Sequence, residues 1–210
     1  MAVNKKLLQG AAAAAPGGLT PSEHFGVVLY EGNGLSSHSI NGGKFGAGAY
    51  TNGSNSNLTY PKETFDINKS HTVSGWVYLR ALQDEDMLFY NHDSNVRLRG
   101  NYSVKYRRNL VNTAYDVNST TTLSTNTWYH IVYTFSTTNG MELYINGSSE
   151  GTNSYTGDAS VHSSDYGLMY RADNGAQRTE GKIDQVRIFT KALSSSEVST
   201  LYAETASTVE

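Results

Sequence analysis

Short runs of alternating hydrophobic and polar residues, separated by Gly, Asn and Ser, fill most of this chain. Such period-two alternation is the pattern of half-buried β-strands. In residues 141–145, Met141, Leu143 and Ile145 share one side, and the Asn146-Gly147 that follows predicts a hairpin turn. We expect strands over residues 27–31, 47–51, 57–60, 71–80, 87–91, 96–99, 102–108, 110–117, 128–135, 141–145, 168–171 and 181–189. The segments 47–51 and 57–60 are expected to form a hairpin around Asn52-Gly53.

The period of the pattern changes at Ser194, directly after the last expected strand. Ser194 and Glu197 have the spacing of a capping box, in which each side chain accepts a backbone N–H at a helix start. Leu193 and Val198 stand at the two positions of a hydrophobic staple, and Leu201 continues an apolar stripe. The sequence therefore predicts a short helix that docks on the last strand.

Many short strands followed by one helix predict an all-β fold. We expect a two-sheet antiparallel jelly-roll sandwich, with one short C-terminal helix and an N-terminal arm. A length of 210 residues suits a single domain, here 23–210, preceded by an arm over 1–22.

Composition excludes several classes of protein. The chain contains no Cys, which removes disulfides, thiol nucleophiles and cysteine-based zinc sites. Its formal net charge of −3 gives no bulk attraction to nucleic acid or membranes, so we expect no nucleic-acid partner. No apolar run approaches the roughly 20 residues of a membrane span.

Five segments resemble the concanavalin A-like, laminin G-like jelly-roll domains in the same order. They are GAGAYTNG (46–53), HTVSGWVYL (71–79), TLSTNTWYHIVYTF (122–135), MELYING (141–147) and GKIDQVRIFTKALSSSEVSTLY (181–202). The resemblance covers about residues 40 to 205 and implies a lectin-like sandwich. It says little about the ligand.

The N-terminal arm carries Lys5, Lys6, Leu7 and Leu8 and then an Ala run over 11–15. Three interpretations remain open: a signal peptide, a flexible leader, and an arm in which these four residues anchor the domain to a neighbouring virion subunit. The leader resembles those of small virion proteins from tailed phages.

Asp184 is the candidate metal ligand. Strand alternation places it on the face of Val186 and Ile188, where a carboxylate is costly unless it is paired or binds a metal. The resemblance implies one structural Ca²⁺ held by this aspartate and by the segment around Asn52, where the family commonly has Asp. The alternative is an Asp184 paired with a basic neighbour or with a backbone N–H.

A basic and aromatic patch is the candidate glycan site. Arginine forks and tyrosine rings suit an anionic glycan, and the sheet of this fold is the usual carbohydrate platform in the resembling family. The residues are Arg97, Arg99, Tyr102, Lys105, Tyr106 and Arg107. The alternatives are a solvated sheet face with salt bridges and an interface with another virion subunit.

We expect no hydrolytic activity. A retaining glycosidase needs two carboxylates about 5 Å apart, whereas Asp84, Glu85 and Asp86 are contiguous and are typical of an exposed acidic turn. His130 is expected to be a structural histidine. Trp76 and Trp128 are either packed residues or sugar platforms.

Together these features predict a non-enzymatic phage virion protein: a head decoration, head fibre or tail appendage that displays a lectin-like domain. Its expected partners are other virion subunits, copies of itself in a homo-oligomer, and a host-surface glycan. The alternative is a secreted or cell-surface bacterial carbohydrate-binding or adhesion module.

Overall fold

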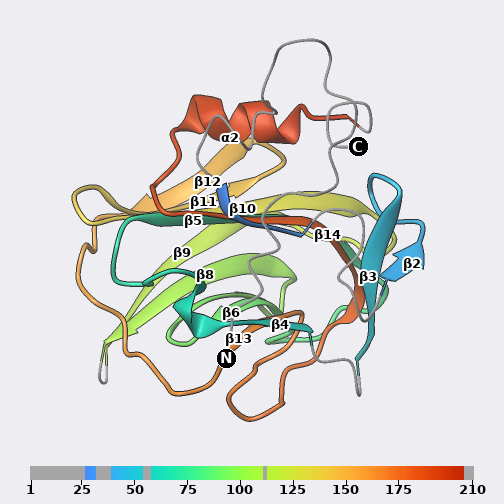
Figure 1. The fold of residues 1–210 in the computed structure, drawn as a ribbon, viewed down its shortest axis with the longest axis horizontal. Coiled ribbons are helices and arrows are strands. Elements are labelled where there is room, and N and C mark those ends of the chain that lie inside the picture. The colour runs from blue at the N-terminus through green and yellow to red at the C-terminus, as the bar shows by residue number, and fades with distance from the viewer. Residues whose placement is uncertain (1–26, 32–38, 54–57, 111–112, 206–210) are drawn as a thin grey trace.

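The protein is a two-sheet antiparallel sandwich with one helix on its outer side (Figure 1). The computed structural model describes residues 27–31, 39–53, 58–110 and 113–205. Eight strands form one sheet, in the order β12-β11-β10-β5-β14-β3-β2 with β1 also paired to β14. Six strands form the other, in the order β4-β13-β6-β7-β8-β9. The predicted fold class is confirmed.

The strands are short and close in length to those predicted from the alternation. The elements are β1 (Val27–Glu31), β2 (Ser39–Asn41), β3 (Ala47–Asn52), β4 (Leu58–Tyr60), the 3₁₀ turn η1 (Lys62–Thr64), β5 (His71–Leu79), β6 (Met87–Asn91), β7 (Ser94–Leu98), β8 (Ser103–Leu110), β9 (Thr113–Thr122), β10 (Trp128–Ser136), β11 (Gly140–Ile145), β12 (Ser148–Asn153), β13 (Tyr166–Leu168), β14 (Glu180–Phe189) and α2 (Ser195–Tyr202).

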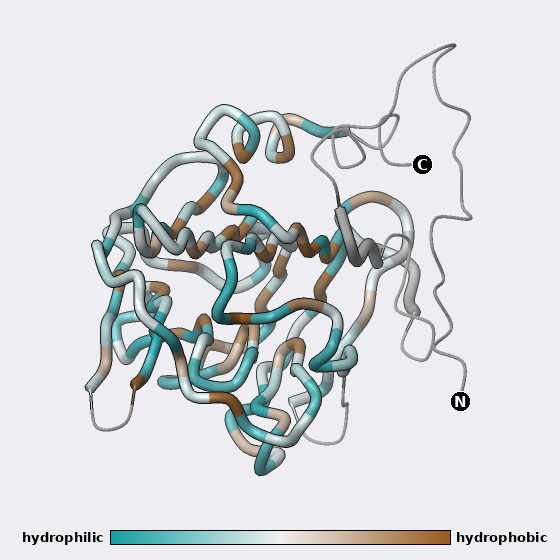
Figure 2. The backbone as a smooth tube through the Cα atoms, turned by 60° about the vertical axis from the view of Figure 1, so that its left-hand side comes forward, coloured by the Kyte–Doolittle hydropathy of each residue, from teal (hydrophilic) through white to brown (hydrophobic). Residues whose placement is uncertain are grey.

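The main core fills the space between the two sheets. Strands of both sheets supply it with one of their faces, so Met141, Leu143 and Ile145 of β11 pack there while Tyr144 points to the other side. Figure 2 shows hydrophobic segments concentrated in the interior strands and the helix, and hydrophilic segments in the surface loops. Because side chains alternate along a strand, the faces turned away from this core are free to carry other chemistry.

Helix α2 covers part of the outer face of the eight-stranded sheet. The predicted capping box is present: Ser194 Oγ accepts from the Glu197 N–H, and Glu197 Oε2 accepts from the Ser194 N–H at 2.8 Å. Leu193 and Val198 are buried in a second apolar cluster between the helix and this sheet. The outer face of the six-stranded sheet has no helix over it among the described residues.

Three predictions of local structure are wrong. The strand expected over 168–171 is β13 (Tyr166–Leu168), so residues 169–171 are not in a strand. Strands β3 and β4 do not form a hairpin, because β3 pairs with β14 and β2 whereas β4 pairs with β13 in the other sheet. Asp184 does not share the face of Val186 and Ile188, because Gln185 has φ +52° and the β5–β14 register shifts between Asp184 and Arg187. This β-bulge keeps Ile183 and Val186 in the core and turns Asp184 outward.

No helix in the described part of the chain is long and apolar enough to cross a membrane.

Candidate functional site

Two rows of polar side chains cross the outer face of the six-stranded sheet; together we call them the polar rows. The first runs through Tyr90, Asn95, Arg107 and Asp116, which are register partners on β6, β7, β8 and β9. The second runs through Arg97, Lys105 and Asn118 on β7, β8 and β9. Alternate residues of the same strands, among them Val96 and Val117, face the core. The sheet therefore sorts apolar and polar chemistry onto opposite faces.

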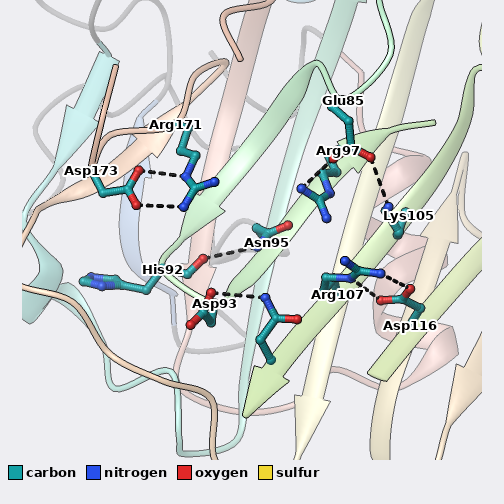
Figure 3. Close-up of polar contacts among 11 residues, drawn as sticks. Glu85, His92, Asp93, Asn95, Arg97, Lys105, Arg107, Asp116, Arg171 and Asp173 are labelled. Atoms are coloured by element: carbon teal, nitrogen blue, oxygen red, sulfur yellow. Dashed lines mark hydrogen bonds and ion pairs between the residues drawn. The ribbon is translucent and has the colours of Figure 1, made fainter. Parts of the chain in front are cut away.

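Glu85 bridges the two cations of the second row (Figure 3). Its carboxylate lies 2.5 Å from Arg97 Nη1 and 3.2 Å from Lys105 Nζ. Burial lowers the pKa of Lys105, and the charge of Arg97 adds to this effect. Burial likewise lowers the pKa of Arg97, against the opposing effect of Glu85. One carboxylate thus serves two partly desolvated cations.

Two further arginines are fixed by forked ion pairs. Arg107 donates from Nε and Nη2 to both oxygens of Asp116, each at 2.6 Å. Arg171, from the loop after β13, forms the same fork with Asp173 at 2.8 and 2.9 Å and lies 6.0 Å from the Tyr90 ring. Although burial alone raises the pKa of Asp116, the hydrogen bonds from Arg107 hold it below its usual value. These forks hold the guanidinium groups in fixed orientations.

Several buried polar atoms on this face have no hydrogen-bond partner among the described residues. They include Arg97 Nε and Asn95 Oδ1 of β7. Asn95 is held through its amide nitrogen, which donates to the His92 carbonyl at 3.2 Å. An unpaired buried donor or acceptor costs about 1–3 kcal/mol, so these atoms favour a ligand or water at this face.

The structure brings together three of the six residues predicted for a glycan site: Arg97, Lys105 and Arg107 (Figure 3). Arg99 and Tyr102 lie in the β7–β8 turn at the margin of the face, where Arg99 donates to Asn118 and Tyr102 is 40% exposed. The prediction of Tyr106 as a glycan-site residue is wrong. It is fully buried on the core side of β8, because strand alternation turns it away from its neighbours Lys105 and Arg107.

The site also contains residues that the sequence did not reveal. Glu85, Asp116 and the Arg171–Asp173 pair are separated from the basic patch along the chain and meet it only through sheet pairing and loop packing, whereas Asn95 precedes Arg97 by two residues on β7. Usable signals existed for Asp116, to which alternation within the expected strand 110–117 gave a definite face, and for Asn95, which stands two residues before Arg97.

The sequence predicted an exposed acidic turn at residues 84–86, but only one of its three carboxylates is exposed. Asp84 is exposed, whereas Glu85, at φ +66°, points to the polar rows. Asp86 is buried and accepts from the Gln83 N–H, and burial raises the pKa of Asp86 to about 6. The three carboxylates thus occupy three different environments.

The predicted calcium ligands lie apart. Asn52 pairs with Glu180, whereas Asp184 lies opposite Gly48, four positions or about 13 Å further along the strand. Both Asp184 oxygens accept backbone N–H groups, Oδ2 from Phe45 at 3.0 Å and Oδ1 from Gln185 at 2.8 Å. Burial raises the pKa of Asp184 to about 6, although these hydrogen bonds act to lower it.

Asp184 and Asn52 therefore do not form the predicted donor set. The described residues contain no group of three or more His, Asp or Glu side chains that fits a metal ion. The backbone N–H groups around Asp184 match the alternative that the sequence left open.

The aromatic candidates lie on the other sheet. Trp76 is buried at the outer face of the eight-stranded sheet, 5.6 Å from the Tyr202 ring of α2 and 5.1 Å from His130. His130 is fully packed, with Nε2 2.8 Å from Ser74 Oγ, and burial lowers the pKa of His130 to about 3. Trp128 is partly exposed beside Tyr78. Trp76 and His130 are therefore packing residues.

The predicted virion-anchoring residues Lys5, Lys6, Leu7 and Leu8 lie outside the described residues.

Comparison with known structures agrees with this architecture. Domain 4 of an extracellular arabinanase from Geobacillus stearothermophilus, solved with arabinotriose, has a TM-score of 0.65 and 22% identity over 78% of this chain and 80% of its own. The binding domain of Paraclostridial Mosquitocidal Protein 1 has a TM-score of 0.61 and 19% identity, over 83% of this chain and 47% of that one. A Trypanosoma rangeli sialidase has a TM-score of 0.58 and 16% identity, over 79% of this chain and 28% of the enzyme.

These likenesses are at the level of the fold. This chain spans about half of the mosquitocidal protein's binding domain and about a quarter of the sialidase. No curated protein sequence matches it. The family model of the concanavalin A-like lectin/glucanases superfamily matches residues 52–199, which is more than half of the chain. The chain therefore belongs to the concanavalin A-like lectin/glucanases superfamily.

Proposed function

We propose that this protein is a non-enzymatic carbohydrate-binding module that holds a glycan against the polar rows. One observation carries the proposal: the outer face of the six-stranded sheet presents fixed polar side chains on four adjacent strands, with no helix over it among the described residues. Sugars offer many hydroxyl groups, so a surface of oriented donors and acceptors suits them.

The ion pairs contribute by fixing the geometry of this surface before a ligand arrives. Asp116 and Asp173 each hold one arginine in a bidentate fork, and Glu85 holds Arg97 and Lys105. Side chains that are already ordered lose little conformational entropy on binding. The arabinanase domain with its bound arabinotriose supports the proposal, because it has this fold and was solved with an oligosaccharide.

A hydrolytic role finds no support in the arrangement of acidic groups on this face. Glu85 is engaged by two cations and Asp116 by one, so each carboxylate is committed to an ion pair. We expect the protein to release no reducing sugar from the glycans that it binds.

A glycan microarray with the folded protein tests the proposal. We expect binding that the double variant Asn95→Ala/Arg107→Ala abolishes, because both residues belong to the first row. Arg80→Ala, an exposed arginine that follows β5 and pairs with Glu180, is the matched control and should bind as wild type. No glycan bound by the wild type, or full binding by the double variant, would refute the proposal.

We further propose that the domain acts at the surface of a phage virion, with residues 1–22 as the anchoring arm. This placement rests on the sequence pattern of the arm; its rival is a secreted or cell-surface bacterial adhesion module. Mass spectrometry of the N-terminal peptide separates them. An intact arm in purified particles supports the virion, and a chain cleaved after the Ala run in culture medium supports secretion.

A further inference from the structure

We propose that the ligand of the polar rows is an acidic glycan whose sugar carboxylate binds Arg97 while a neighbouring hydroxyl donates to Asn95. This inference rests on the proposed function and names its ligand class. Arg97 and Asn95 lie on the same face of β7, two residues apart, and the Arg97 guanidinium is drawn between Arg171 and Arg107 in Figure 3.

The charge balance of the rows favours an anion. Three cations, Arg97, Lys105 and Arg107, face two carboxylates, Glu85 and Asp116, so one positive charge is uncompensated. The neighbouring Arg171–Asp173 fork is neutral as a pair. This local excess is opposite in sign to the whole chain, whose formal net charge is −3.

The excess charge belongs to Arg97 and Lys105, the two neighbours that share one carboxylate. Glu85 is shared between Arg97 and Lys105, whereas Arg107 has a carboxylate of its own. Burial lowers the pKa of Arg97, and the nearby charges of Arg107 and Arg171 act in the same direction. A bound carboxylate would supply the negative charge that these crowded cations lack.

The unpaired hydrogen-bonding groups on this face have the complementary chemistry. Arg97 Nε is a buried donor without a partner, and Asn95 Oδ1 is a buried acceptor without a partner, among the described residues. Residues two apart on a strand are about 7 Å apart, which is close to the span between a ring carboxylate and a hydroxyl on the same sugar. A uronic or sialic acid residue offers both groups, whereas a neutral sugar brings no negative charge to offset the excess that Glu85 leaves on Arg97 and Lys105.

Calorimetry with matched acidic and neutral ligands tests the inference. One arm compares tri-galacturonic acid with its methyl ester, and the other compares sialyllactose with lactose, so the two arms separate uronic from sialic acid. We expect at least tenfold tighter binding of the acidic member in one arm, weakening as NaCl rises from 20 to 150 mM. Dextran sulfate controls for bulk charge and should bind more weakly than the preferred acid.

Variants at Arg97 locate the preference. Arg97→Gln should bind the acid and its neutral counterpart equally. Arg97→Lys, which keeps the charge but loses the planar fork, should retain part of the preference. Arg80→Gln removes one positive charge from the other sheet and should change nothing. A thermal melt of each variant tests whether it is folded. If Arg97→Gln is not folded, Arg97→Lys provides the readout.

The outcomes separate this inference from the proposed function. Equal binding of acid and ester, lost in Asn95→Ala/Arg107→Ala, overturns the acidic ligand and leaves the glycan platform standing. A preference for the acid that survives Arg97→Gln also overturns the inference. So does dextran sulfate that binds as tightly as the preferred acid. No binding of any sugar overturns both.

Discussion

Replacing Arg108 by Met should destabilise the domain by about 3–5 kcal/mol. Arg108 belongs to β8, the strand that carries Lys105 and Arg107, but it is fully buried on the other side. Its guanidinium donates to the Ile67 carbonyl at 2.9 Å and to Ser94 Oγ at 3.2 Å, and it lies 3.6 Å from the Phe135 ring centre.

The magnitude follows from what the substitution leaves unpaired. A second guanidinium nitrogen donates to Asn68 Oδ1 at 3.2 Å and to the Gly157 carbonyl at 3.1 Å. Ile67 is buried, so its carbonyl loses a partner that water does not replace, at about 1–3 kcal/mol. Asn68 and Gly157 are partly exposed and regain water, so their lost hydrogen bonds cost about 1 kcal/mol each. Met keeps the apolar contact with Phe135.

Urea unfolding followed by tryptophan fluorescence measures this effect. We expect an unchanged m-value, a lower midpoint, and a Tm reduced by about 6–20 °C for a domain of this size. Arg99→Met, at an exposed arginine in the β7–β8 turn, is the control and should change stability by less than about 0.5 kcal/mol. A loss below about 1 kcal/mol in Arg108→Met would refute the reasoning, because it would mean that the carbonyl groups find other donors.

Three further predictions concern the helix cap, Asp184 and calcium. Ser194→Ala should cost about 1 kcal/mol in a thermal melt because it removes the capping box, whereas Ser195→Ala should be near neutral; equal effects would contradict the role of the cap. The folded-state pKa of Asp184 is about 6, above the unfolded value of about 4. The stability that this difference gives the folded state is therefore fully present below pH 4 and is lost as the pH rises through 6. The stability of wild type relative to Asp184→Asn should therefore fall between pH 4 and 7 in urea titrations, by on the order of 2 kcal/mol, and a flat difference would show that Asp184 keeps its ordinary pKa. Because Asn52 and Asp184 lie apart, EDTA should leave the Tm unchanged; a Tm raised by Ca²⁺ and lowered again by EDTA would restore the predicted metal.

The features predicted correctly were those that neighbouring residues decide. The capping box needs only Ser194 and Glu197, and the alternation of 141–145 needs only a strand with one side in the core. Lys105 and Arg107 share a face because residues two apart on one strand do so, and the pairing of β7 with β8 brings Arg97 beside them. The same rule excluded Tyr106, which alternates with Lys105 and Arg107.

The features missed depend on contacts between distant residues. The Gln185 bulge reverses the side of Asp184, and strand alternation has no means of predicting an extra residue in the ladder. Strand β4 follows β3 closely in sequence but belongs to the opposite sheet, because its pairing partner is β13, more than 100 residues later. Glu85 reaches the basic residues only because the β5–β6 turn packs beside β7 and β8.

By itself the sequence determined the strand-rich sandwich, the capped final helix and the cationic character of β7 and β8, since these follow from local periodicity, capping and side-chain charge. Only the tertiary structure decided how that charge is used. Sheet pairing placed Asp116 against Arg107 and left Glu85 shared between Arg97 and Lys105, so one positive charge remains uncompensated. That balance depends on distances across strands, because charges interact strongly only when they are close and partly desolvated.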